Sequence, residues 1–162
     1  MNHATVTSVQ LSRALSALGI NFIMGSDGRP TSLRKQPARL LAALAASDEA
    51  RLRLSLIPLF LQHPEFAAYV PQAAELLAPP ARLTLECYYS AAVWLGQEQQ
   101  ILLPDLLSRE LGIIVTNDPV ENLRRLAQRH AELSGIKINW LGTYQHAAQV
   151  WLKGQEFQRT TA

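Results

Sequence analysis

The chain has 162 residues, of which 48% are hydrophobic and 17% are charged, and its formal net charge is +2. This length is typical of one domain, and the hydrophobic content excludes a disordered chain. The weak net charge does not indicate a general affinity for nucleic acid. Cys87 is the only cysteine, which excludes a disulfide within the chain and a cysteine-based zinc site.

The sequence predicts a cytoplasmic protein. Residues 1–15 lack the basic and apolar segments of a signal peptide. A membrane-spanning helix needs about 18 or more apolar residues, and the uncharged run at 54–62 has about half that length. A single cysteine also fits a reducing compartment.

The first part of the chain predicts one helix followed by an irregular segment. Residues 7–18 carry apolar side chains at helical spacing, and Gly19 is a suitable end for that helix. Residues 21–28 are typical of a short extended stretch followed by a glycine-containing turn, a pattern compatible with a small hairpin. Pro37 then suits the first turn of a helix that ends near Ala46.

A second apolar helix is predicted directly afterwards. Ser47 is expected to cap it, and Asp48 and Glu49 would place negative charge at its N-terminus, where the helix dipole favours it. The following segment, 50–62, is apolar on nearly all sides, so we expect it to be buried within the domain or against a partner. Pro58 should kink this helix because it lacks a backbone N–H.

Prolines and glycines divide the rest of the chain. The predicted helices cover 65–69, 71–77, 81–97, 102–111, 119–134 and 143–152. The helix at 119–134 has the strongest signals, with Asn117 or Asp118 as its cap, Pro119 in its first turn and Gly135 at its end. Gly154 is expected to stop the last helix.

These elements predict an all-α fold, a single compact bundle of about seven helices. The domain would comprise an N-terminal helix plus basic loop at 1–36, a helical core at 37–154 and a frayed tail at 155–162.

One catalytic pattern stands out, the segment from Arg125 to His130, which reads RLAQRH. It resembles the R-x4-H motif of HEPN-domain ribonucleases, which are also compact helical bundles. The resemblance implies that Arg125 and His130 act on an RNA phosphodiester. It covers six residues and departs from the family at Leu126, where a polar residue is usual. The alternative is an ordinary surface, with helical ion pairs accounting for the charges and His130 at the apolar face.

Two further groups of basic residues are candidates for binding nucleic acid or phosphate. Residues 105–130 resemble a DNA-binding helix-turn-helix in their first half, at Leu107, Ser108 and Gly112, but Asp118 stands where that family has an apolar residue. The resemblance implies that arginines of the second helix meet phosphates. The candidate residues are Arg124 and Arg129, and, in the N-terminal basic loop, Arg29, Arg34, Lys35 and Arg39. For the second group, the N-terminal basic loop, an ordinary solvated loop is the favoured interpretation.

Three aromatic residues share one side of the final helix: Trp140, Tyr144 and Trp151. They belong either to the core or, if exposed, to an interface, since Trp and Tyr often dominate binding. The sequence predicts no cofactor and no metal site, because its four histidines are far apart in the chain.

The favoured hypothesis is a non-enzymatic protein–protein interaction module, either a homo-oligomer or the small partner of a larger enzyme. In its general character the chain is similar to small helical proteins encoded beside minimal nucleotidyltransferases in bacterial toxin–antitoxin-like pairs. That similarity implies an antitoxin-like role. The alternative is a nucleic-acid-acting protein, either a HEPN-like ribonuclease using Arg125 and His130 or a degenerate helix-turn-helix DNA binder at 105–130.

Overall fold

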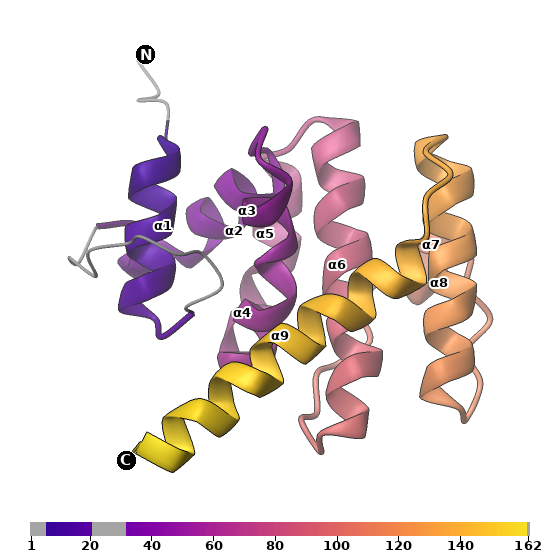
Figure 1. Cartoon of the computed structure of the whole chain (residues 1–162). Helices are drawn as coiled ribbons and strands as arrows, with labels where there is room; N and C mark the ends of the chain where they lie inside the picture. Colours follow the sequence, from indigo (N-terminus) through magenta and orange to yellow (C-terminus); the bar gives the residue numbers. More distant parts are fainter. Residues whose placement is uncertain (1–5, 21–31, 162) are drawn as a thin grey trace.

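The fold is described by a computed structural model that covers residues 6–20 and 32–161 (Figure 1). The described residues form α-helices and short 3-10 helices and contain no strand, which confirms the predicted all-α bundle. The hairpin considered for residues 21–28 lies outside the described part of the chain. None of the helices in the described residues has the length and apolar character needed to cross a membrane.

The N-terminal helices follow the predicted pattern. Helix α1 (Ser8–Ala17) starts at Thr7, whose side chain accepts a hydrogen bond from the backbone N–H of Gln10. The short helix η1 (Ser32–Lys35) leads into α2 (Pro37–Ala45), with Pro37 in its first turn.

The predicted helix from Asp48 onward is two helices, α3 (Ala50–Leu54) and α4 (Leu56–Gln62). The prediction that Ser47 caps it is wrong. The Ser47 hydroxyl oxygen accepts the N–H of Glu49 at 3.1 Å, within the turn that precedes α3. This bond stabilises the turn before α3, whereas the first N–H groups of α3 itself have no side-chain cap.

The break between α3 and α4 falls at Ser55 and has its cause in Pro58. A proline has no N–H to bond the carbonyl four residues earlier, and its ring crowds that carbonyl. The affected carbonyl here belongs to Leu54, the last residue of α3. The bend predicted from the sequence is therefore present, displaced toward the N-terminus by one helical turn.

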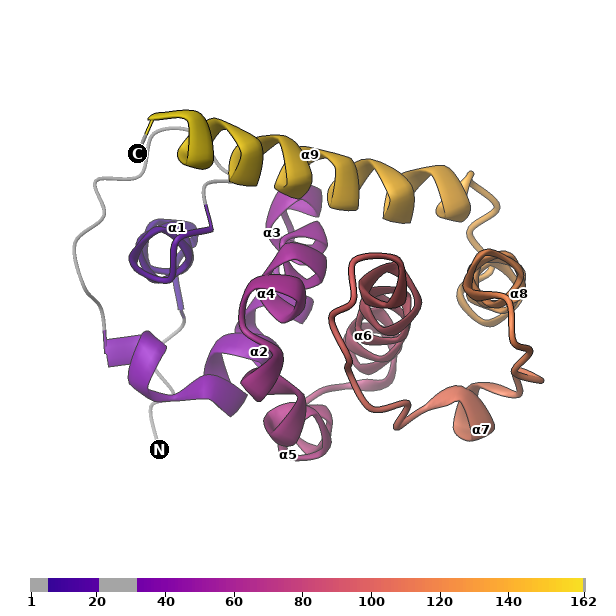
Figure 2. The same ribbon diagram turned by 90° about the horizontal axis from the view of Figure 1, so that it is seen from below.

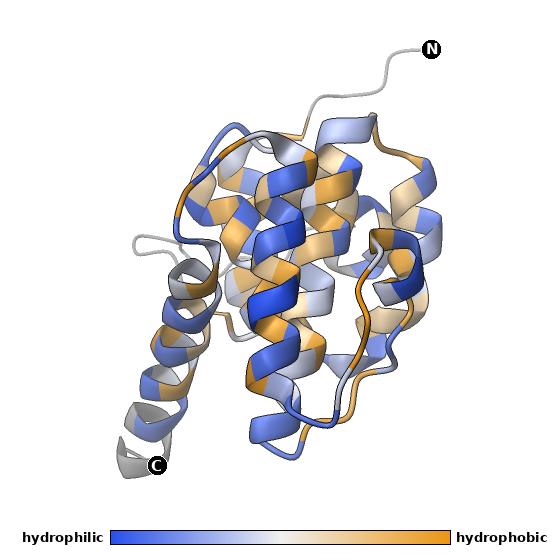
Figure 3. Cartoon of the chain, turned by 90° about the vertical axis from the view of Figure 1, so that its right-hand side faces the viewer, coloured by the Kyte–Doolittle hydropathy of each residue, from blue (hydrophilic) through white to orange (hydrophobic). Residues whose placement is uncertain are grey.

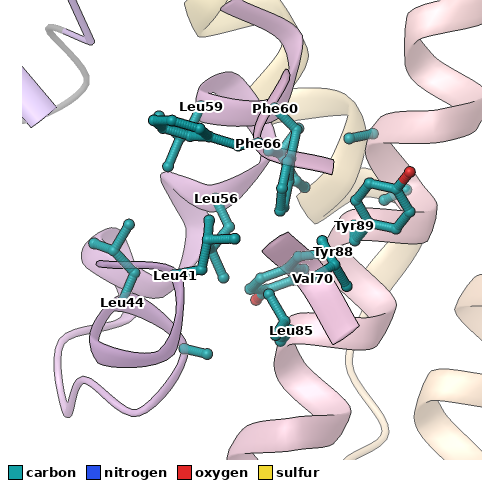
Figure 4. Close-up of a cluster of buried hydrophobic side chains, with 14 of the residues drawn as sticks. Leu41, Leu44, Leu56, Leu59, Phe60, Phe66, Val70, Leu85, Tyr88 and Tyr89 are labelled. Atoms are coloured by element: carbon teal, nitrogen blue, oxygen red, sulfur yellow. The ribbon is translucent and has the colours of Figure 1, made fainter. Parts of the chain in front are cut away.

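Helix α4 lies in the middle of the core, and other helices of the same chain surround it. Its residues from Leu56 to Leu61 are all buried. It packs against α2, α3, the 3-10 helix η2 (Pro64–Tyr69), α6 and α9. Figure 4 shows side chains of α2, α4, η2, α5 and α6 in one cluster, including Leu41, Leu44, Leu56, Leu59, Phe60, Phe66, Val70, Leu85, Tyr88 and Tyr89.

Helix α6 (Pro79–Glu98) has 20 residues and runs through the core. It follows α5 (Val70–Glu75), and Pro79 and Pro80 form its first turn, earlier than the start predicted from the sequence. Every residue from Cys87 to Gly96 is buried. A helix that is buried around its whole circumference must pack against several others. The helices that pack against α6 are α2, α4, α5, α8 and α9.

The predicted helix at 102–111 is wrong except for its last turn, α7 (Ser108–Leu111). The preceding residues are held in an irregular path by tertiary hydrogen bonds. The Tyr89 hydroxyl donates to the carbonyl oxygen of Pro104 at 2.5 Å, and Asp105 Oδ1 accepts the N–H of Ser108 at 3.1 Å. The carbonyl of Pro104 and the N–H of Ser108 thus bond side chains and not the backbone groups that they would bond within a helix.

The last two helices are α8 (Pro119–Ser134) and α9 (Trp140–Thr161). Asp118 caps α8, and Gly135 ends it at a φ of 73°, as predicted. The predicted stop of α9 at Gly154 is wrong, because the helix continues through most of the expected tail, to Thr161. Viewed from below, α9 crosses one side of the bundle, while α1, α6 and α8 are seen almost end-on (Figure 2).

Candidate functional site

A cavity of about 420 Å³ lies where the N-terminal turns of α6 approach the C-terminal end of α8. Arg53 of α3 and the start of the connection between α8 and α9 complete its walls. The lining is a mixture of apolar and polar side chains: Arg53, Pro79, Pro80, Leu83, Thr84, Tyr88, His130, Leu133, Ser134, Ile136 and Trp140. This volume falls within the range of about 300–1,000 Å³ that small-ligand sites occupy.

His130 is the most enclosed polar group in this lining, with only 3% of its surface exposed. Its Nδ1 lies 2.6 Å from the hydroxyl oxygen of Tyr144, which is fully buried. Its ring stacks on the indole of Trp140, with the centroids 3.6 Å apart. Helices α8 and α9 thus hold the imidazole in one orientation.

The hydrogen bond to Tyr144 also determines which His130 nitrogen carries the proton. A buried hydroxyl hydrogen needs an acceptor, and Nδ1 of His130 is the acceptor that Tyr144 has among the described residues. Burial lowers the pKa of His130 to about 4, so the ring is neutral at pH 7. With Nδ1 accepting, the proton of the neutral ring is on Nε2, which has no protein partner in the described part of the chain.

Tyr88 brings a second polar group with unused hydrogen-bonding capacity to the cavity. Its side chain is 5% exposed, and its hydroxyl makes no hydrogen bond to any described residue. Burial raises the pKa of Tyr88 to about 12, and the nearby positive charge of Arg53 acts in the opposite direction. The hydroxyl is therefore protonated at pH 7 and can donate to a bound group.

Arg53 supplies the positive charge of the cavity. Its Nη1 donates to the carbonyl oxygen of Ser47 at 2.8 Å, and it pairs with no carboxylate of the described residues. The neighbouring Arg51, by contrast, lies 3.2 Å from Glu49 in an exposed ion pair. The guanidinium of Arg53 therefore keeps donors available for an anionic group.

Apolar side chains border this cavity on the molecular surface. Leu133 is 45% exposed and Ile136 is 54% exposed, and both line the opening. Ile138, on the same connection between α8 and α9, is equally exposed. The indole Nε1–H of Trp140 donates to the carbonyl oxygen of Ile136 at 2.9 Å, which fixes this connection over the cavity. We refer to Leu133, Ile136 and Ile138 as the apolar rim.

The structure does not bring Arg125 and His130 together. Arg125 Nη1 donates to the carbonyl oxygen of Ile114 at 2.7 Å, and its Nε bonds Glu121. It lines a different, more open hollow beside the connection from α7 to α8. The predicted pair thus has its members in separate places on α8.

The other arginines of α8 are engaged within the protein. Arg124 pairs with Glu121 at 2.6 Å, and Arg129 pairs with Glu132 at 2.6 Å. Arg129 Nε also donates to the carbonyl oxygen of Leu111, at the end of α7. Figure 3 shows hydrophilic and hydrophobic residues alternating along α8, as expected for a helix with one packed face.

The N-terminal basic residues are only partly described. Arg29 lies outside the described residues, and the side chain of Arg34 is not described. Lys35 and Arg39 are exposed, and Arg39 Nη1 donates to Gln36 at 3.4 Å.

The three aromatic residues predicted for the core or an interface differ in their exposure. Tyr144 is fully buried, and Trp140 is 9% exposed at the edge of the cavity. Trp151 is half-buried, and its Nε1 donates to Gln62 of α4 at 2.8 Å. Tyr144 is therefore a core residue, whereas Trp140 borders the cavity and Trp151 is partly accessible.

Groups typical of nucleophilic or metal chemistry are scarce in the described residues. Burial raises the pKa of the Cys87 thiol to about 12, so it is not an activated nucleophile. No group of three or more His, Cys, Asp or Glu side chains is placed to hold a metal ion among the residues described. No family model, curated protein or solved structure gives a significant match to the chain.

Sequence reasoning identified His130 and Trp140 but missed Arg53 and Tyr88 as site residues. The four come from α3, α6, α8 and α9, so no local motif connects them. The available signals were an arginine in the apolar segment 50–62 and a tyrosine hydroxyl on the helix predicted at 81–97.

Proposed function

We propose that the protein is a non-enzymatic interaction module that recognises a protein partner through the cavity and its apolar rim. The observation that supports this proposal most strongly is the combination of an open cavity of about 420 Å³ with exposed Leu133, Ile136 and Ile138 beside it. Exposed apolar groups next to a hollow can seat a side chain of another protein and exclude water around it.

Binding is favoured over catalysis by the chemistry of the same groups. A neutral His130 with its proton on Nε2 offers a donor toward the cavity and not a base. The protonated Tyr88 hydroxyl and Arg53 guanidinium also donate. The proposal includes a cytoplasmic location, supported by a single buried cysteine. The partner is either a larger enzyme or a second copy of this chain.

Co-purification from the native host, followed by identification of stoichiometric proteins and by sedimentation, tests this function. The wild-type chain is compared with Ile136→Asp at the rim and with Leu102→Asp, an equally apolar exposed residue after the opposite end of α6. We expect Ile136→Asp to lose the partner and Leu102→Asp to keep it. Retention by both variants, or a wild-type monomer without any stoichiometric partner, would contradict the proposal.

A further inference from the structure

We infer that the cavity receives a carboxylate, carried beside an apolar group by the partner protein. This inference rests on the proposed function and adds the chemistry that the cavity selects. It is carried by three side chains from three different helices that line one cavity: Arg53, Tyr88 and His130.

The three groups can all act as hydrogen-bond donors. Arg53 retains guanidinium N–H groups beyond the one bonded to Ser47. The hydroxyl of Tyr88 has no partner among the described residues, although its side chain is 5% exposed. His130 presents Nε2–H because its Nδ1 accepts from Tyr144. These groups line an open cavity, where a ligand that offers acceptor oxygens can bond several of them at once.

The charge of the cavity narrows the choice of acceptor. Arg53 is the positively charged group of the lining, and no Asp or Glu side chain lines the cavity to neutralise it. A carboxylate offers two acceptor oxygens that match a guanidinium, and it can reach an additional donor. An uncharged amide would bring its own N–H donors into a cavity that already contains donors.

The remainder of the lining selects an apolar group next to that carboxylate. Pro79, Pro80 and Leu83 of α6 form one apolar wall, and Leu133 and Ile136 lie at the opening. The stacked rings of Trp140 and His130 give a flat aromatic side. The acid would therefore sit among the donors, with the apolar group against the prolines and the rim.

Matched acids and amides test this inference. The probes are 3-phenylpropionate against 3-phenylpropionamide, and the peptide acetyl-Ile-Leu-Phe with a free carboxylate against its C-terminal amide. Each is titrated into the whole chain while the indole Nε1–H signal of Trp140 is followed by NMR, because that group bonds Ile136 at the rim. We expect each acid to bind at least tenfold more tightly than its amide.

Variants locate the effect. Arg53→Gln should weaken binding of the acids at least tenfold, whereas Arg51→Gln on the same helix should not change it, since Arg51 pairs with Glu49. Tyr88→Phe removes an unpartnered hydroxyl and should leave the fold intact while weakening the acids several-fold. It therefore keeps the test decisive if Arg53→Gln does not fold.

The outcomes separate this inference from the proposed function. Equal binding of acid and amide, or unchanged binding in Tyr88→Phe, overturns the carboxylate site even if the partner still depends on Ile136. Binding of 3-phenylpropionate with exclusion of the peptide acid also overturns it, because the source is then a small molecule and not a protein partner.

Discussion

The hydroxyl oxygen of Tyr144 lies 2.6 Å from Nδ1 of His130, and this bond joins α9 to α8 at the wall of the cavity. Burial raises the pKa of Tyr144 far above its ordinary value, so its hydroxyl keeps the proton that it donates. The bond fixes His130 as a neutral ring with an Nε2–H group. We expect nitrogen NMR of the imidazole at pH 7 to identify this tautomer, and a proton on Nδ1 would contradict it.

The low pKa of His130 makes the stability of the fold depend on pH. The folded ring has a pKa of about 4, below the value of about 6.5 in an unfolded chain, so the unfolded state binds the proton more readily. The resulting stability is complete above about pH 6.5 and is lost as the pH falls toward 4, with a slope of up to about 1.4 kcal/mol per pH unit.

Urea unfolding between pH 7 and pH 5 measures this slope. In His130→Gln the free energy of unfolding should no longer fall with this slope as the pH is lowered. In His146→Gln, which changes an exposed position on α9, the slope should be the same as in the wild type. The same slope in wild type and in His130→Gln would show that another group is responsible.

The loss of the hydroxyl should destabilise the fold at Tyr89 but not at the adjacent Tyr88. Tyr89→Phe leaves the carbonyl of Pro104 without its donor, so we expect the free energy of unfolding to fall by about 1–2 kcal/mol. Tyr88→Phe removes a hydroxyl without a partner among the described residues, so we expect the free energy of unfolding to change by less than about 0.5 kcal/mol. Denaturant unfolding compares them, and an equal loss in both would mean that Tyr88 has a structural hydrogen bond.

Gly96 is required by the close return of the chain after α6. A Cβ at this position would lie 2.8 Å from the carbonyl oxygen of Ile101, a backbone atom that cannot move freely. We expect Gly96→Ala to destabilise the fold by about 1–3 kcal/mol. Gly154→Ala is the control, because nothing lies within 4 Å of its Cβ, and it should be neutral or slightly stabilising. Thermal unfolding distinguishes them; a Gly96→Ala chain as stable as wild type would contradict the account.

The sequence predicts some helices well because their signals are local. Asp118, Pro119 and Gly135 define α8 within the range of their own hydrogen bonds and backbone angles. The helix expected at 102–111 forms only in its last turn, because Tyr89 and Asp105 hold the preceding residues in another path. Such competition between local preference and tertiary bonding is not visible in a short window of sequence.

The candidate site was harder to predict for a related reason. Its donors converge only after α3, α6 and α8 have packed together, so their spacing in the chain carries no signal. Residues that did form a recognisable pattern, Arg125 and His130, bond in separate places: Arg125 to Ile114 and Glu121, and His130 to Tyr144.

The ribonuclease alternative makes a distinct prediction for Arg125. If preparations of the chain cleave RNA, we expect Arg125→Ala to leave the rate unchanged, because its side chain bonds Ile114 and Glu121. A parallel His130→Ala measurement serves as the comparison. Loss of cleavage in both variants, with the fold intact by circular dichroism, would favour the nuclease hypothesis.

Site-specific crosslinking in the native host tests the central claim most directly. A photoreactive benzoylphenylalanine replaces Ile136 at the rim or, as the control, Leu102, which is 83% exposed after the opposite end of α6. We predict that irradiation joins the residue at 136 to one defined protein, either a partner or a second copy of this chain, and that 102 gives no such product. A crosslink from 102 alone, or none from 136, would contradict the assignment of the cavity and its rim as the recognition site.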